Sequence, residues 1–139
     1  KTQNTMKKFG LTILSIMFVG FLVGGILSGL FYENAQAQMA SNFPAAVKLA
    51  PDISFMLINI FAMALFTTLC FDKMGIRSAK EGAMTGWWFM GLFFVVFHAQ
   101  ELAVMNIITI EFATIDVLLS ALMGLVLGAV CGESLRRFS

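Results

Sequence analysis

The sequence predicts an all-helical protein built as a bundle of four membrane-spanning helices. Of the 139 residues, 59% are hydrophobic and 12% are charged, whereas soluble domains are about half apolar and about a quarter charged. The mean hydropathy is +0.88. The apolar residues form four runs close to the roughly 20 residues that cross a bilayer as a helix, and polar segments separate the runs. We therefore expect one transmembrane domain over residues 1–139, surrounded by the lipid bilayer.

The first predicted span covers residues 9–32, which carry no charge. The run is longer than the roughly 20 residues that cross the hydrocarbon core, so the helix can tilt. Ala35 and Ala37 resemble a signal-peptidase site, but the run is also longer than the roughly 7 to 15 apolar residues of a signal peptide. We expect an uncleaved helix, which the good helix formers in residues 33–40 can prolong until Pro44 stops it.

The second predicted span covers residues 53–71 and follows Asp52, whose carboxylate is placed to cap the free N–H groups of the helix start. A short charged turn comes next. Ser78 and Glu81 have the spacing of a capping box, in which the hydroxyl and the carboxylate satisfy each other's backbone N–H groups. The third span is therefore expected over residues 80–99.

The fourth span is expected over residues 115–132, with Asp116 in its first turn, where the helix dipole favours an acidic side chain. Residues 102–114 are apolar but contain Asn106 and Glu111. This pattern predicts an interfacial or re-entrant connection, or a helical extension that ends in a turn. The third and fourth apolar runs correspond to about 24 Å of helix, against a hydrocarbon core of about 30 Å. Local thinning of the bilayer, or entry of the adjacent mildly polar residues into it, covers the difference. The alternative is that these two runs do not span.

Eight of the nine basic residues fall on one side of the predicted bundle. They precede the first span, separate the second from the third, or follow the fourth, whereas Lys48 lies alone on the other side. Cytoplasmic loops carry the excess of Lys and Arg. The pattern predicts a multi-pass protein of the cytoplasmic (inner) membrane, with cytoplasmic N and C termini and an even number of spans. The eight residues are Lys1, Lys7, Lys8, Lys73, Arg77, Lys80, Arg136 and Arg137.

Glycines recur at intervals of four on the first, third and fourth predicted helices. Small residues let the backbones of membrane helices approach closely, so these stripes predict helix packing. One stripe can serve the interior and another a contact with a second copy or a larger complex. A groove that admits a lipid or a substrate is the alternative. The glycines are Gly20, Gly24, Gly25, Gly29, Gly82, Gly86, Gly124, Gly128 and Gly132.

His98 is the only histidine. Glu101 shares its helical face, and Met105 follows seven residues after it, so the three side chains could bind a transition metal or a haem iron. One imidazole is a poor ligand set, and the simpler interpretation is an interfacial histidine bonded to a neighbouring helix or to water. A proton relay is a further possibility, for which the ionisable partners are Glu101, Glu111 and Asp116. These acids also make the connection negative, which would attract cations.

Asn59 is the most deeply placed strong polar residue of the second span, and Thr67 continues its helical face. An amide surrounded by lipid needs a partner, so Asn59 is expected to point into the bundle. A hydrogen bond to another helix is favoured over contact with a ligand.

No motif of a known chemistry stands out. There is no Gly-rich phosphate loop and no Ser/His/Asp arrangement, and the basic residues form no patch for nucleic acid. We expect no enzyme and no cofactor, but an accessory or structural membrane subunit that assembles as a homo-oligomer or within a larger complex. The alternatives are a small transporter or channel lined by Asn59, Thr67, His98 and Glu101, and a haem- or metal-binding redox subunit that uses His98.

The segment from Gly75 to Trp88, followed by Asn106 and a glycine-spaced last helix, resembles the second half of small bacterial four-span membrane proteins grouped as domains of unknown function. The resemblance covers residues 75–132 and includes a Gly-x-x-x-Gly-Trp opening. It implies a four-span fold and brings no activity. Near Tyr32 the chain lacks the Pro-containing turn expected after the first helix of such proteins.

Overall fold

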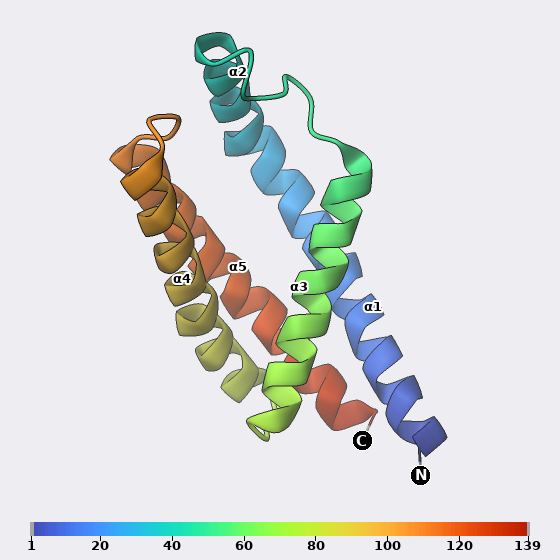
Figure 1. Ribbon diagram of the computed structural model, residues 1–139. Helices are drawn as coiled ribbons and strands as arrows, with labels where there is room; N and C mark the ends of the chain where they lie inside the picture. The colour runs from blue at the N-terminus through green and yellow to red at the C-terminus, as the bar shows by residue number, and fades with distance from the viewer. Residues whose placement is uncertain (1, 139) are drawn as a thin grey trace.

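The computed structural model describes residues 2–138, with side chains from residue 6 onward. Lys1, one of the predicted basic residues, lies outside this range. The elements are α1 (Thr2–Leu27), the π-helical turn η1 (Ser28–Tyr32), α2 (Glu33–Asn42), α3 (Ile53–Lys73), α4 (Ala79–Val104) and α5 (Ile110–Arg137). The first three follow one another without a break, so the chain forms four long helices, each long and apolar enough to cross a membrane (Figure 1). This confirms the predicted all-helical class with four apolar helices.

The two ends of the molecule differ in charge. Both termini and the turn between α3 and α4 lie at one end (Figure 1), which we call the basic end because Lys7, Lys8, Lys73, Arg77, Lys80, Arg136 and Arg137 belong to these segments. The loops of residues 43–52 and 105–109 lie at the opposite end. We call this the acidic end, because Asp52 ends the first of these loops, and Glu101 and Glu111 lie on the helix ends beside the second.

Side chains cap the starts of α3 and α4. The carboxylate of Asp52 accepts a hydrogen bond of 3.0 Å from the N–H of Ser54, as predicted. The hydroxyl of Ser78 accepts one of 3.2 Å from the N–H of Glu81. The carboxylate of Glu81, however, accepts from the N–H of Arg77, so only half of the predicted capping box forms.

Helix α5 begins earlier than the sequence predicted. The hydroxyl of Thr109 accepts a 3.1 Å hydrogen bond from the N–H of Phe112 and caps the helix. Because α4 runs to Val104, only residues 105–109 connect the two helices, which agrees with the helical extension and not with a re-entrant segment. The placement of Asp116 in the first turn was wrong, since α5 starts at Ile110 and Asp116 lies in the second turn, buried.

The length of the last two helices also bears on the prediction that they could be too short to span. Helix α4 has 26 residues and α5 has 28. At 1.5 Å per residue these are about 39 and 42 Å long, which exceeds a hydrocarbon core of about 30 Å. The polar residues next to each apolar run are therefore part of the helix.

Helices α4 and α5 touch backbone to backbone. A Cβ atom added to Gly86 would lie 1.9 Å from the carbonyl oxygen of Gly124, and one added to Gly128 would lie 2.1 Å from that of Gly82. No real Cβ fits at such distances, so the pair requires glycine on both sides. Gly132 makes the same kind of approach, to the carbonyl of Ser78. The glycine stripe of the last helix is thus used inside the chain.

The glycines of α1 are packed less tightly. Cβ atoms added to Gly20 and Gly24 would meet side chains of α5 at 3.5 to 3.7 Å, which is ordinary van der Waals contact. Added Cβ atoms on Gly25 and Gly29 would meet nothing within 4 Å. The first predicted stripe therefore has one edge toward α5 and another that faces open space.

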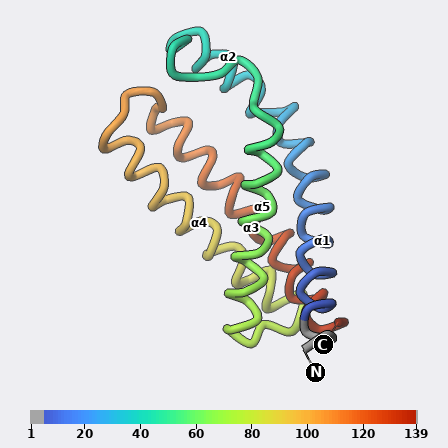
Figure 2. The backbone as a smooth tube through the Cα atoms, turned by 45° about the vertical axis from the view of Figure 1, so that its right-hand side comes forward, coloured from blue at the N-terminus to red at the C-terminus, as the bar shows by residue number. Residues whose placement is uncertain are grey.

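The apolar core fills the half of the molecule toward the basic end. Its members come from α1, α3 and α5, and they are Ile13, Ile16, Ala64, Phe71, Leu127, Cys131 and Leu135. Helix α3 reaches α4 through aromatic rings, such as Phe66 and Phe89 with centroids 5.5 Å apart. Toward the acidic end α3 moves away from α4, as Figures 1 and 2 both show.

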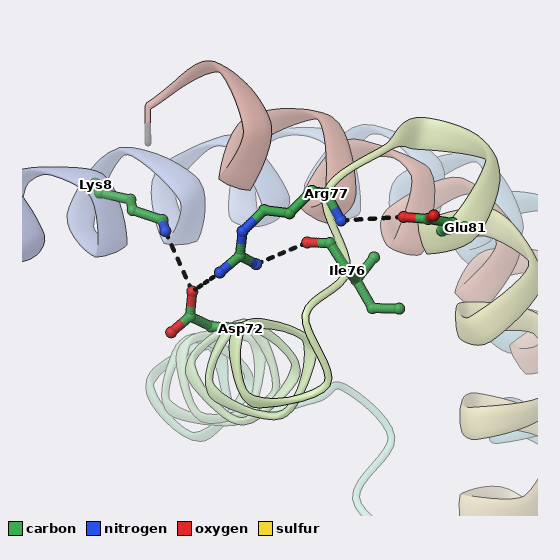
Figure 3. Close-up of polar contacts among 5 residues, drawn as sticks. All are labelled: Lys8, Asp72, Ile76, Arg77 and Glu81. Carbon is green, nitrogen blue, oxygen red and sulfur yellow. Dashed lines mark hydrogen bonds and ion pairs between the residues drawn. The ribbon is translucent and has the colours of Figure 1, made fainter.

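An ion-pair cluster joins three segments at the basic end (Figure 3). Oδ1 of Asp72 accepts from Nζ of Lys8 at 3.2 Å and from Nη2 of Arg77 at 2.7 Å. The other terminal nitrogen of Arg77 donates to the carbonyl of Ile76 at 2.8 Å. The Asp72 carboxylate at the end of α3 therefore binds both the start of α1 and the α3–α4 turn.

Candidate functional site

Four polar side chains form a hydrogen-bonded chain in the half of the molecule toward the acidic end. In this group, which we call the His98 cluster, Nδ1 of His98 lies 2.7 Å from Oε2 of Glu101 and Nε2 lies 2.6 Å from Oδ2 of Asp116. The hydroxyl of Tyr32 donates to Oδ1 of Asp116. The side chains of His98 and Asp116 are only 6% and 8% exposed, whereas that of Glu101 is 27% exposed. Among these three, Glu101 is therefore the one that reaches the surface.

The helix hairpin of α4 and α5 brings His98 and Asp116 together. The two residues are 18 positions apart in the sequence, and the short loop of residues 105–109 turns α5 back along α4. The glycine contacts between Gly82, Gly86 and α5 hold the two backbones close. The imidazole can therefore reach the facing carboxylate directly.

The π turn η1 supplies Tyr32. The N–H of Glu33 donates to the carbonyl of Ser28, five residues earlier, in place of the usual i−4 partner. Single π turns inside α-helices often occur at functional sites. Here the turn ends on the one residue through which the first helix joins the His98 cluster.

Aromatic rings surround the cluster. Phe112 lies edge-on to the imidazole of His98, with centroids 6.1 Å apart, and it stacks on Phe31 at 5.7 Å. Phe94 and Phe97 contact the same imidazole at 6.0 and 5.5 Å. Apolar walls lower the local dielectric constant, which strengthens the hydrogen bonds and makes an unpaired polar group costly.

The distances set how many protons the cluster holds. Each contact between a ring nitrogen of His98 and a carboxylate oxygen requires one shared proton. With both protons on the imidazole and both carboxylates ionised, the cluster carries one net negative charge. Glu101, whose side chain is 27% exposed, is more accessible to water than His98 and Asp116. The cluster thus shares protons between one imidazole and two carboxylates inside an apolar helix pair.

A cavity of about 170 Å³ adjoins the His98 cluster on the side of the apolar core. All four long helices contribute to its walls, and its polar lining comes from Asn59, Thr67 and Ser120. Ser120 follows Asp116 by one turn of α5, and Phe94 lines the cavity while its ring contacts His98. The cluster and the cavity are therefore neighbours.

The structure places the sequence-predicted polar residues at two adjacent sites and not along one path. His98 and Glu101 belong to the cluster, whereas Asn59 and Thr67 line the cavity. Asn59 is exposed at the edge of the cavity, and within residues 2–138 its amide has no hydrogen-bond partner, contrary to the helix-to-helix bond that we favoured. Met105 ends α4 in an extended conformation and does not continue the face of His98.

One member of the cluster escaped the sequence analysis, and another was placed only in part. Asp116 was named as an ionisable partner of His98 in a possible proton relay, but it was assigned to the start of the helix, and its position opposite Glu101 across the imidazole was not predicted. Tyr32 was not considered, although it is the only tyrosine and stands at the end of a long uncharged run. A polar aromatic residue at that position, together with the only histidine, is the signal that could have found the site.

A metal at His98 and Glu101 would compete with the hydrogen bonds that the imidazole already makes. Both ring nitrogens face carboxylate oxygens, on opposite sides of the ring. In the part of the chain that the structure describes, no group of three or more His, Cys, Asp and Glu side chains is arranged to hold a metal ion. Metal or haem ligation by His98 stays a prediction from the sequence.

Comparison with known proteins identifies no relative of this protein, so the function is inferred from the geometry of the site. No protein-family model matches the chain, and no match is found among curated proteins or solved structures.

Proposed function

We propose that this protein is a small proton-coupled transporter whose four long helices cross the cytoplasmic membrane. The observation that carries the proposal is the His98 cluster, three ionisable side chains and a tyrosine bonded to one another within apolar helices. Ionisable residues inside membrane spans are rare and expensive, and they mark proton relays and substrate pathways.

The distribution of charge supports an orientation. The basic end carries the Lys and Arg residues of both termini and of the α3–α4 turn, and an excess of such residues is typical of cytoplasmic loops. The acidic end then faces outward, and Glu101 meets the outer solution. Protons enter the His98 cluster from that side.

The packing favours a carrier over a channel. Between the cavity and the basic end, the side chains of the apolar core fill the space, including the fully buried Phe71 and Leu135. The ion pairs of Asp72 fasten the helices beyond that core. The His98 cluster and the cavity therefore lie on the outer side of a closed core, as expected of a transporter that opens to one side at a time.

The alternatives from the sequence have less support. Of the predicted packing glycines, Gly82, Gly86, Gly124, Gly128 and Gly132 are used within one chain, so these stripes no longer argue for assembly. Only Gly25 and Gly29 remain open for a second copy or a larger membrane complex. An accessory role and the absence of enzymatic activity stay predictions.

The test is proton flux in proteoliposomes that enclose a pH-sensitive dye. The native protein is compared with His98→Asn, Asp116→Asn and a matched control, Glu111→Gln, an exposed acid of the same helix. Uncharged organic compounds of up to one ring are added in turn. We expect at least one of them to drive a proton flux above that of protein-free vesicles, and both cluster variants to lower that flux by about tenfold or more.

The results separate the possible functions. A constant proton leak without any added compound would indicate a channel. Equal flux in native and Asp116→Asn vesicles, or no flux with any compound, would contradict the proposal. Reporter tags that place the two termini on opposite sides of the membrane would contradict the orientation.

A further inference from the structure

We infer that the 170 Å³ cavity beside the His98 cluster binds a small uncharged molecule of about one six-membered ring that carries one hydroxyl or amide group. This inference rests on the proposed function, because it names the substrate class of the transporter. It draws on the size of the cavity, the absence of charge in its lining and two polar groups without a protein partner.

The volume sets the size of the ligand. An engineered apolar cavity of about 150 Å³ in another protein holds benzene. The cavity here is slightly larger and is walled mainly by apolar side chains such as Ile16, Met63 and Leu127. One ring with a single substituent fits this space, whereas a long lipid chain or a sugar polymer does not.

The lining sets the charge of the ligand. None of the residues that line the cavity is Asp, Glu, Lys or Arg. A charged molecule would lose its hydration and find no opposite charge in return, which costs far more than the cavity could supply. The occupant is therefore uncharged when it is bound.

Two polar side chains require a hydrogen-bonding group on the ligand. Within the described residues, the amide of Asn59 and the hydroxyl of Thr67 make no side-chain hydrogen bond, and both line the cavity. Thr67 is only 5% exposed. Leaving such a group unpaired in apolar surroundings is unfavourable. Asn59 and Thr67 lie eight residues, about 12 Å, apart along the helix, so the one hydroxyl or amide of the ligand can bond to only one of them, which we assign to Asn59.

The position of the cavity beside the His98 cluster explains how ligand binding would be coupled to proton transfer. The wall of the cavity includes Ser120, one turn after Asp116 on α5, and Phe94, whose ring contacts His98. A molecule bound in the cavity would therefore contact residues that lie directly beside Asp116 and His98 of the His98 cluster. The cavity is nevertheless a separate site from the His98 cluster, since neither His98 nor Asp116 lines it.

The experiment is a fluorine NMR titration of the full chain in nanodiscs with 4-fluorophenol, with empty nanodiscs as the baseline for partition into lipid. Fluorobenzene, which lacks the hydroxyl, is the paired probe. We expect saturable binding of 4-fluorophenol to the native protein. Asn59→Leu should weaken it by about five- to tenfold, as expected for one lost hydrogen bond, and leave fluorobenzene binding unchanged.

A pair of neighbouring substitutions tests the location. Met63→Trp fills the cavity and should abolish binding of both probes, whereas Ala62→Trp, at an exposed position outside the lining, should leave it intact. Circular dichroism and gel filtration establish that each variant is folded. If 4-fluorophenol does not saturate above the empty nanodiscs, or binds Met63→Trp as well as Ala62→Trp, the inference is wrong.

A further variant separates the two proposals. Asp116→Asn should bind 4-fluorophenol with native affinity but lose the proton flux. Binding without any effect of Asp116→Asn on flux would leave the cavity assignment standing and contradict the transporter. Normal proton flux with a different compound, but no binding of 4-fluorophenol, would overturn the substrate class alone.

Discussion

Nε2 of His98 lies 2.6 Å from Oδ2 of Asp116, and this contact ties α4 to α5 toward the acidic end of the hairpin that they form. The glycine contacts around Gly86 and Gly124 tie the same two helices further toward the basic end. The hairpin is thus held by backbone contact in one half and by a buried polar pair in the other, and the two can be tested separately.

The His98–Asp116 contact should give a coupling free energy of about 1 to 3 kcal/mol in a double-mutant cycle. The cycle uses His98→Asn, Asp116→Asn and the double variant, with thermal unfolding in detergent as the measurement. The control Glu111→Gln should change stability by less than about 0.5 kcal/mol, since its side chain is exposed. Additive effects of the two single substitutions would show that the contact contributes nothing.

Gly86→Ala should destabilise the protein by about 3 kcal/mol, because its Cβ atom would meet the backbone carbonyl of Gly124, which can move only if the helices separate. Gly25→Ala is the matched control, since its Cβ meets nothing within 4 Å. It should raise stability by about 0.5 to 1 kcal/mol through better helix propensity. Similar effects of the two substitutions on the midpoint of thermal unfolding would contradict the close approach of α4 and α5.

Thr12 and Thr68 are both fully buried but differ in their hydrogen bonds. The hydroxyl of Thr68 donates to the carbonyl of Ala64 at 2.7 Å, whereas that of Thr12 has no partner. Thr12→Val should therefore raise the free energy of unfolding by about 1 kcal/mol, and Thr68→Val should lower it by about 1 kcal/mol. Unfolding of both variants in the same detergent checks this, and a loss of stability in Thr12→Val would mean that its hydroxyl is bonded.

Asp72→Asn should lower stability by roughly 1 kcal/mol at low salt, because it removes the charge shared by Lys8 and Arg77. The effect should shrink at about 1 M salt, where charges are screened within a few ångströms. Asp52→Asn is the control: asparagine keeps the helix cap, and the ion pair with Lys48 is largely exposed. A salt-independent loss in Asp72→Asn would point to hydrogen bonding and not to charge.

The sequence analysis recovered the features that depend on composition and on neighbouring residues. Apolar runs give long helices because lipid requires internally bonded backbone, and Asp52 caps α3 because a cap needs only the next residues along the chain. The sequence also indicated that the glycine stripes serve packing, but not which helix each stripe faces. That depends on how the whole chain turns back on itself.

The candidate site was predicted only in part, for the same reason. Glu101 lies one helical turn from His98, so spacing alone places it nearby. Asp116 becomes a partner only when Thr109 starts α5 early and the hairpin closes, and Tyr32 only through a π turn that leaves no clear pattern in the sequence. Contacts between elements are set by tertiary packing, which local propensities do not encode.

The π turn that ends at Tyr32 also means that the first helix contains one residue more than a regular α-helix of the same length. If that surplus passes along the helix by one position, each residue it crosses rotates by about 100° around the axis, while the ends of the helix stay in place. Such a rotation would withdraw the phenol from Asp116 without melting or sliding any element. The first helix could then connect and disconnect its tyrosine as a rotating switch, with its anchor at Lys8 undisturbed.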